Sequence, residues 1–302
     1  MNKVLKDNYI YTFSKNNKPA LYCDDNDIIE VYTLDCYSNM YRSENDRYKL
    51  ASIHSNPATG PIYVNGAKPG DVLKVEILNI KVDNVGFVCT FKGCGALRDK
   101  TELRTKTFEI KDDKVKFNDL TIDINPMIGV IGTAHETLEI SSGKSFDCGG
   151  NMDSNIITKG STVYFPVRVD GALLAMGDIH ALMGDGEISG TGIEISGVIT
   201  IKVSIIKNFE LNYPVTETKD AWFVNTFGDC ANQAIIRGYD ELQRLISKAY
   251  SWDYTDTCLY MSVQAILSAN QACLTHDKYE DEYNGPTFRV GCPKILGKDL
   301  IK

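Results

Sequence analysis

The chain has 302 residues, a formal net charge of −8 and nine cysteines. Its 43% hydrophobic and 24% charged residues are typical of a globular protein and exclude a disordered, collagen-like or coiled-coil chain. The acidic balance argues against a sequence-independent nucleic-acid binder, which needs surplus Lys and Arg for phosphate contacts. The length predicts two domains, or one large domain with an appendage.

The N-terminal segment and the cysteine pattern predict a cytoplasmic protein. The N-terminal MNKVLKDNYIYTF has no apolar core followed by a cleavage site, so no secretory signal is expected. The cysteines are odd in number and form no CxxC pair, which favours reduced thiols over disulfides or a zinc ribbon. The uncharged run 257–276 contains several amides and hydroxyls, so we expect a buried soluble helix over 257–274 and no membrane partner.

The first two-thirds of the chain predict β structure. Short runs rich in Val, Ile, Tyr and Thr recur between Gly, Pro and Asp turn signals, and this spacing is typical of a sandwich or barrel. The clearest runs are 28–33, 62–64, 72–82, 107–110, 122–124, 162–169 and 193–205.

The pattern changes after Pro214. Apolar residues from Ile235 to Ala249 recur at helical spacing, and Thr287–Val290 reads as a final strand. We therefore predict a mainly β fold with a β-rich catalytic domain over 1–214 and a small α+β portion over 215–302 packed against it.

The segment 171–187, GALLAMGDIHALMGDGE, carries the clearest chemistry. An apolar run, 172–176, leads into a glycine-rich turn that holds two carboxylate groups and a histidine. Asp178 and His180 are spaced i, i+2, so a continuing strand would project both from one face, as two ligands of one metal ion require. Asp185 and Glu187 repeat that spacing. A solvated acidic hairpin is the alternative, and the series that an EF-hand requires is absent.

Three other places could join this site. Asn151 and Asp153 follow a glycine turn, and Asn56 stands beside a rigid Pro-containing turn. Asp35 follows an apolar strand, where burial would be costly unless the carboxylate were paired or metal-bound. Plain turns and an exposed strand-end carboxylate are the alternatives.

Four motifs in order identify the chain as similar to the acetamidase/formamidase family. They are NPATGPIYVNGAKPGDVL (56–73), PMIGVIGT (126–133), GGNMD (149–153) and GDIHALMGDGE (177–187). The resemblance implies a β-rich fold, a homo-oligomer and hydrolysis of a small aliphatic amide to a carboxylate and ammonia. Some members carry a divalent metal.

The resemblance implies seven site residues: Asn56, Asn151, Asp153, Asp178, His180, Asp185 and Glu187; Asp35 also matches a family pattern. The chain departs from the family at His135, where Pro is typical, at Asn56, where His can occur, and at Leu182-Met183, where Gln is usual before Gly. These departures leave formamide and acetamide open as substrates.

A mechanism follows as a hypothesis. Asp178, His180 and Asp35 would hold a divalent metal, with zinc as first choice and calcium as the alternative if the ligands are mostly carboxylates. Glu187 would take a proton from water, and Asp185 would assist it.

Substrate contacts would come from Asn56, Asn151 and Asp153. The alternatives are a non-catalytic β-sandwich binding module with a cation site, and a hydrolase of a larger or cyclic amide.

Overall fold

The computed structural model describes residues 2–273 and 285–302, and two large sheets form its body. The first sheet has nine strands in the order β1-β5-β19-β7-β16-β20-β21-β23-β22. Their bounds are β1 Asn2–Val4, β5 Ile28–Thr33, β19 Gly197–Ile206, β7 Val72–Val82, β16 Thr162–Pro166, β20 Val215–Glu217, β21 Ala221–Phe227, β23 Thr287–Pro293 and β22 Ile266–Ala269.

The second sheet has ten strands, and the path β14-β15-β12-β17-β18-β8-β9 runs through it. These strands are β14 Ser145–Phe146, β15 Gly149–Asn151, β12 Met127–Gly132, β17 Leu174–His180, β18 Glu194–Ile195, β8 Val85–Cys89 and β9 Thr105–Glu109. β6 (Ala58–Val64) pairs with β17 and also with β2 (Tyr9–Ile10) and β4 (Leu21–Cys23). Two small sheets pair β10 (Lys114–Phe117) with β11 (Leu120–Asp123), and β3 (Thr12–Phe13) with β13 (Ile140–Ser141).

The main core lies between the two large sheets. Alternate residues of β19, such as Ile199, Ile201 and Val203, are fully buried, as the two-residue period of a strand requires. They share one apolar cluster with Ile128 of β12 and Met176 of β17 in the other sheet. Neither sheet closes on itself within the described ranges, so the predicted β fold is confirmed and its form is a sandwich.

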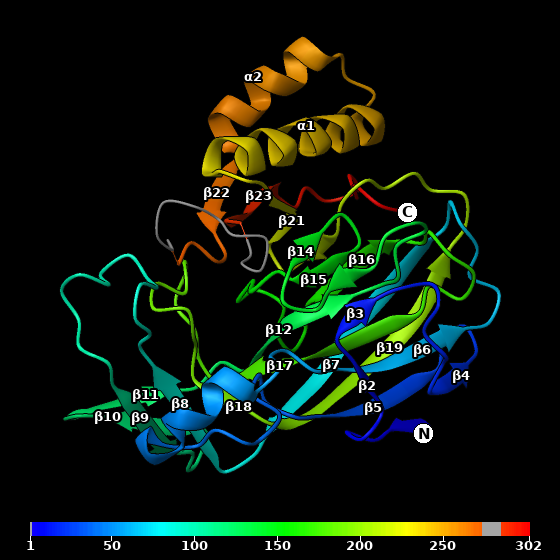
Figure 1. Ribbon diagram of the computed structural model, residues 1–302. Coiled ribbons are helices and arrows are strands. Elements are labelled where there is room, and N and C mark those ends of the chain that lie inside the picture. The colour runs from blue at the N-terminus through cyan, green and yellow to red at the C-terminus, as the bar shows by residue number, and fades with distance from the viewer. Residues whose placement is uncertain (1, 274–284) are drawn as a thin grey trace.

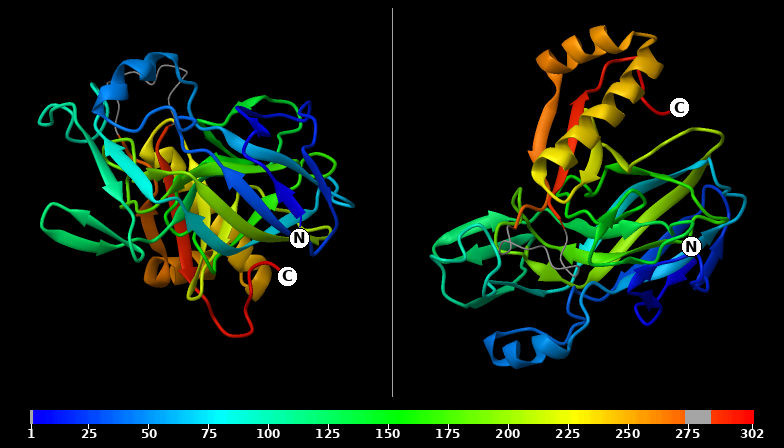
Figure 2. Two further views of the ribbon diagram at one scale, coloured as in Figure 1. Left: turned by 90° about the horizontal axis from the view of Figure 1, so that it is seen from below. Right: turned by 45° about the horizontal axis from the view of Figure 1, so that its top comes forward.

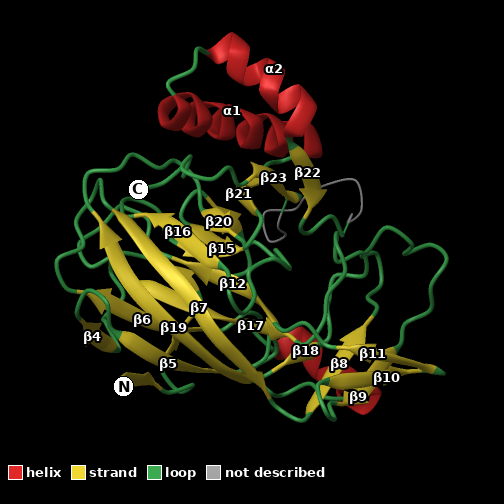
Figure 3. Ribbon diagram, turned by 180° about the vertical axis from the view of Figure 1, so that it is seen from behind, coloured by secondary structure: helices red, strands yellow, loops and turns green. Residues whose placement is uncertain are grey.

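Two helices cover the C-terminal strands (Figures 1 and 2). α1 (Ala231–Tyr250) has the predicted helical face, and its Leu242 and Ile246 pack against Val224 of β21 and Val290 of β23. Because β20 to β23 extend the nine-stranded sheet, the C-terminal region shares backbone pairing with the rest (Figure 3). The proposed domain division at residue 214 stays a prediction.

The predicted helix over 257–274 is wrong in its extent and its burial. α2 spans Tyr254–Gln264 and is exposed except at Thr257 and Met261, which are buried, and Tyr260, which is half-buried. It ends at Ala265, and the next four residues form β22 because they pair with β23. Neither helix among the described residues is long and apolar enough to cross a membrane. A 3₁₀ helix over Glu44–Ser52 has no counterpart in the predicted elements.

The predicted strand 193–205 is divided between the two sheets. β18 pairs with β17 and β8, whereas β19 pairs with β5 and β7, so the chain crosses between sheets at Ser196. The Ser196 hydroxyl donates to Asp83 Oδ2 at 2.6 Å. Glu194, on the β18 side of the crossing, is paired with His180 of β17.

Candidate active site

A cluster of four carboxylates surrounds one imidazole at the end of β17. His180 Nε2 lies 3.4 Å from Asp178 Oδ1 and 3.2 Å from Glu194 Oε1. It also lies 4.0 Å from both Asp153 Oδ1 and Glu187 Oε1. All five side chains are at most 5% exposed, so the groups share one dry environment; we call them the acidic cluster.

The sheet explains how residues far apart in sequence meet here. β17 continues through Asp178 to His180, so both side chains reach the same cluster, as their spacing predicted. His180 is the cross-strand partner of Glu194 on β18. Asp153 follows β15, and Glu187 lies in the turn after β17. The backbone amide of Glu187 donates to Gly184 O at 3.2 Å within that turn.

Three of the four acids have strained backbones. Asp153, Asp178 and Glu187 adopt φ values of 45°, 53° and 42°, in the left-handed region that non-glycine residues rarely occupy. Such a conformation costs about 1–3 kcal/mol and persists only where the surroundings fix it. The strain is therefore concentrated where the carboxylates converge.

Two glycines make room for the cluster. A Cβ on Gly129 of β12 would lie 2.6 Å from Asp153 Oδ1 and 2.8 Å from Asp178 Oδ2. A Cβ on Gly192 would lie 2.8 Å from His180 Nδ1. Any larger residue at either position must displace a member of the cluster.

Gln271 joins two of the acids from the C-terminal region. Its Nε2 donates to Asp153 Oδ2 and to Glu187 Oε2 at 2.6 Å each, and the side chain is buried. The amide has two N–H groups, so it can satisfy both carboxylates at once. Gln271 is itself held by a β-bridge to Gly186, beside Glu187.

The cluster carries more negative charge than it can balance. Within residues 2–273 and 285–302, His180 is the sole cation at ion-pair distance from these four carboxylates. Full ionisation would leave four negative charges against one positive charge in a dry site, which is strongly unfavourable. Protons or a bound cation must therefore compensate.

The pKa directions express the same imbalance. Burial, then the carboxylate of Glu187, raises the pKa of Asp153 well above its usual value. Burial raises the pKa of Glu187 and brings that of Glu194 to about 8. Burial lowers the pKa of His180, but the carboxylates of Glu194 and Asp178 more than offset it and raise the pKa well above 6.5.

Two groups of side chains in the cluster have the donors and spacing to hold a metal ion. One is Asp153, His180 and Glu187, and the other is Cys36, Asp178 and Glu194; within each, the ligand atoms lie within 4.8 Å of one another. Asp153 Oδ1, Asp178 Oδ1 and Glu194 Oε2 are buried without a hydrogen-bond partner. Buried carboxylate oxygens in that state fit a cation, because each otherwise keeps its full desolvation cost.

Four predicted site residues lie outside this cluster. Asp35 is fully buried, but its Oδ1 accepts from the amides of Tyr37 and Asn39, and its Oδ2 pairs with Arg42 at 2.9 Å. Asp185 is 49% exposed and pairs with Arg289 at 2.8 Å.

The amides Asn151 and Asn56 have other neighbours. Asn151 Nδ2 donates to Gly143 O at 3.4 Å. The backbone amide of Asn56 donates to Cys36 O at 2.7 Å, which places the residue beside the second ligand group. No side-chain contact between either amide and the acidic cluster is among the contacts described for residues 2–273.

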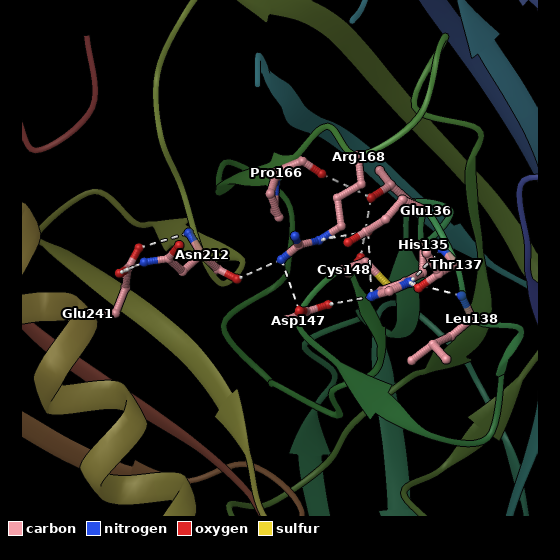
Figure 4. A network of polar contacts seen from close by, with 11 residues as sticks. His135, Glu136, Thr137, Leu138, Asp147, Cys148, Pro166, Arg168, Asn212 and Glu241 are labelled. Atoms are coloured by element: carbon pink, nitrogen blue, oxygen red, sulfur yellow. Dashed lines mark hydrogen bonds and ion pairs between the residues drawn. The ribbon is translucent and has the colours of Figure 1, made fainter. Parts of the chain in front are cut away.

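His135 belongs to a separate network beyond the other end of β12 (Figure 4). Its Nδ1 accepts from the amides of Thr137 and Leu138, which leaves the proton on Nε2. That nitrogen faces Glu136 Oε2 at 3.5 Å, and Arg168 pairs with Asp147 at 2.9 Å beside it. His54 is exposed, with its ring tilted against that of Tyr11 at a centroid distance of 4.1 Å, and His276 lies outside the described residues.

Sequence reasoning did not identify Glu194 or Gln271. Glu194 stands between Ile193 and Ile195 in an apolar strand, where the cost of burying a carboxylate is a usable signal. Gln271 offers no such signal, because it lies 84 residues beyond Glu187 in an unremarkable loop.

Known proteins resemble the chain in sequence and in structure. The model of the acetamidase/formamidase family matches residues 13–142 and 140–279. A formamidase of Methylophilus methylotrophus is 50% identical over 70 residues, a stretch covering 23% of this chain and 17% of that relative. The matches to curated relatives thus span less than a fifth of their length.

Two crystal structures cover nearly the whole chain. A predicted acetamidase/formamidase from Thermoanaerobacter tengcongensis is 38% identical with a TM-score of 0.89, covering 97% of this chain and 95% of that one. An acetamidase from Bacillus halodurans is 34% identical with a TM-score of 0.88, covering 96% and 97%.

Proposed function

Because the chain belongs to the acetamidase/formamidase family, we propose that its acidic cluster hydrolyses a small aliphatic amide, such as formamide or acetamide, to the carboxylate and ammonia. The observation that carries this proposal is the convergence of four buried carboxylates on one imidazole, since amide hydrolysis needs groups that both accept and donate protons. The linear C–N bond of the amide is cleaved.

The residues present fit a divalent cation, and we assign it to Asp178 and Glu194 of one ligand group together with His180 of the other, since the His180 Nε2 atom lies between them. These three have the shortest contacts in the cluster, and two of their oxygens lack hydrogen-bond partners. Zinc suits one imidazole nitrogen with two carboxylates better than calcium, which prefers oxygen ligands alone. The cation would polarise the amide carbonyl and lower the pKa of water.

Glu187 and Asp153 are then left for proton transfer. Gln271 holds their carboxylates side by side, so one proton shared by the pair makes one member an acid while the other stays a base. Glu187 accepts the proton as water attacks the carbonyl carbon. The pair then gives a proton to the leaving nitrogen, because ammonia leaves readily only when that nitrogen is protonated.

The outlying residues have supporting parts in this proposal. Asp35 shapes the loop 35–42, which contains Cys36, through Arg42, and Asp185 anchors Arg289. Asn56 and Asn151 remain candidates for contacts with the substrate.

Two further statements are part of the proposal. The chain works in the cytoplasm, which fits its nine free cysteines, and it forms a homo-oligomer. Exposed apolar side chains on α2, including Leu259 and Val263, and the open edge of β22 offer surface for such an assembly.

The test of the proposed function is ammonia release from formamide and acetamide by the wild type and by Glu187→Gln. Glutamine keeps the size of the side chain but cannot accept the proton, so kcat should fall by about 10²–10⁴-fold. A wild type that releases no ammonia from either amide, or a variant with unchanged kcat, contradicts the proposal. Glu210→Gln, the same change at an exposed carboxylate outside the cluster, is the control and should retain most of the activity.

A further inference from the structure

Two of the nine cysteines form a pair beside the acidic cluster. The side chains of Cys94 and Cys273 lie close enough for each thiol to shift the pKa of the other, and both are partly exposed. They come from the loop after β8 and from the loop after β22, 179 positions apart in sequence. The other seven cysteines are either buried or, as with Cys230 and Cys258, exposed.

The backbone brings the pair together independently of that thiol contact. Both loops attach to the turn 186–190, which carries Glu187. On one side, Cys94 Sγ contacts Ser189 O at 3.8 Å, and the amide of Ala96 donates to Ile188 O at 3.0 Å. On the other side, the amide of Ala272, next to Cys273, donates to Gly186 O at 2.8 Å.

We propose that Cys94 and Cys273 are a modification site: a thiol pair that peroxide oxidises to a reversible disulfide beside the acidic cluster. The bond would join the loop after β8 to the loop that carries Gln271. Formation of the bond does not depend on the proposed function, whereas its effect on turnover does.

The reaction balances with hydrogen peroxide as the oxidant. The Cys94 thiolate attacks one peroxide oxygen, the O–O bond breaks, and a sulfenic acid and water result once the leaving hydroxide takes a proton. The Cys273 sulfur then attacks the Cys94 sulfur and expels a second water. Two thiols lose two electrons and two protons, and one peroxide becomes two waters.

The surroundings favour Cys94 as the attacking thiol. The neighbouring Cys273 thiol, with Arg98 nearby, lowers the pKa of Cys94, although burial and Glu187 oppose this. The pKa of Cys273 is raised by the Cys94 thiol and by burial, so it stays protonated until the second step. A lowered pKa in a partly exposed thiol is the usual setting of a reactive cysteine.

The expected effect on the site runs through Gln271. A disulfide requires the two sulfurs to close to about 2.05 Å, which moves the backbone next to Gln271. The two 2.6 Å hydrogen bonds from Gln271 to Asp153 and Glu187 leave little tolerance for such a shift. Oxidation should therefore lower amide turnover.

The decisive test is a thiol count by mass. The wild type is treated with hydrogen peroxide, unfolded, alkylated with iodoacetamide and mapped as non-reduced peptides. We expect a Cys94–Cys273 disulfide and alkylation of the remaining seven of the nine thiols. Alkylation of all nine, or a disulfide between other cysteines, would overturn the proposal, whether or not the protein hydrolyses amides.

Variants connect the bond to turnover. Peroxide should lower formamide hydrolysis by the wild type at least tenfold, and dithiothreitol should restore it. Cys94→Ser and Cys273→Ser should keep their activity within about twofold under the same treatment. Cys230→Ser, the control at an exposed cysteine, should respond like the wild type. Equal loss in Cys94→Ser would overturn the proposed effect on turnover.

Discussion

The acidic cluster shows why a functional site can cost a protein stability. Each of its carboxylates would be more stable in water, and three of the four have left-handed backbones. The surrounding sheet holds them because β12 and β17 are buried along their whole length and leave no room for a relaxed arrangement. The protein bears this cost in stability because, in the proposed function, the crowded carboxylates carry out the proton transfers of amide hydrolysis.

Gly129 is the residue whose small size the cluster depends on most. Gly129→Ala puts a methyl group within 3 Å of carboxylate oxygens of Asp153 and Asp178, so both must move. We expect at least a tenfold loss of kcat and a destabilisation of about 1–3 kcal/mol, as in other overpacked cores.

The matched control is Gly184→Ala, because nothing lies within 4 Å of a Cβ at that position and its φ is not left-handed. Kinetics and thermal unfolding of the two variants measure the difference. Equal kcat and equal unfolding midpoints for the two variants would show that the acids do not depend on the small size of Gly129.

Gln271 should act as a positioning residue. Gln271→Leu keeps the bulk but removes the donor shared by Asp153 and Glu187, leaving two buried oxygens unsatisfied at about 1–3 kcal/mol each. We expect kcat to fall at least tenfold with a smaller change in KM, and the acid limb of the kcat–pH profile to move.

The control is Gln264→Leu, at the exposed end of α2, which should leave kcat and its pH profile as in the wild type. A Gln271→Leu enzyme that is merely less stable, with the wild-type pH profile, would reduce the role of Gln271 to packing.

For individual residues, the sequence predicts some members of the acidic cluster and misses others. The spacing of Asp178 and His180 predicted that they would face one place, and the family motifs added Asp153 and Glu187. Glu194 and Gln271 depend on strand pairing between distant segments, which spacing along the chain does not encode. The pairing of Asp35 with Arg42 was missed for another reason: the two residues are near each other in sequence, but the loop between them is irregular and has no periodicity.

Among the elements, long strands with alternating apolar residues were predictable, and their partners were not. The run 72–82 matches β7 residue for residue, because apolar and polar residues alternate over 73–77 and again over 79–82, and alternation is a strong signal for a strand. The run 193–205 carries the same alternation, yet its two halves belong to different sheets. The apolar run after α2 was assigned to a helix, because only pairing with β23 makes it a strand.

Gly238 decides how closely α1 packs on its sheet. Helix propensity alone favours Gly238→Ala by about 1 kcal/mol. However, a Cβ there would lie 2.4 Å from Val290 Cγ2 of β23, and overpacking costs about 1–3 kcal/mol. The cost of overpacking should exceed the gain in helix propensity, so we expect Gly238→Ala to have a lower midpoint of thermal unfolding than the wild type.

Asn232→Ala, at an exposed position of the same helix, should leave that midpoint unchanged or raise it. A more stable Gly238→Ala would mean that α1 can move away from β23 at little cost.

For the whole molecule, the candidate site links the middle of the chain, residues 153–194, to the C-terminal region. The ten-stranded sheet supplies the acids and the imidazole, and the region between β22 and β23 supplies Gln271. The nine-stranded sheet continues into that region through β21 and β23, so the position of Gln271 depends on the whole fold. Composition and periodicity predict the β class. That Gln271 reaches the acidic cluster follows from the strand order of the sheets, which they do not predict.

The most direct test of the account measures bound metal and formamide turnover in the same samples. The wild type should carry about one equivalent of a divalent metal, with zinc as the expected ion, and a chelator should remove metal and activity together. His180→Ala should lose the metal and lower turnover at least a hundredfold, whereas His54→Ala, at an exposed histidine that is not a member of the cluster, should keep both. A His180→Ala protein with wild-type metal content and wild-type turnover would contradict the account.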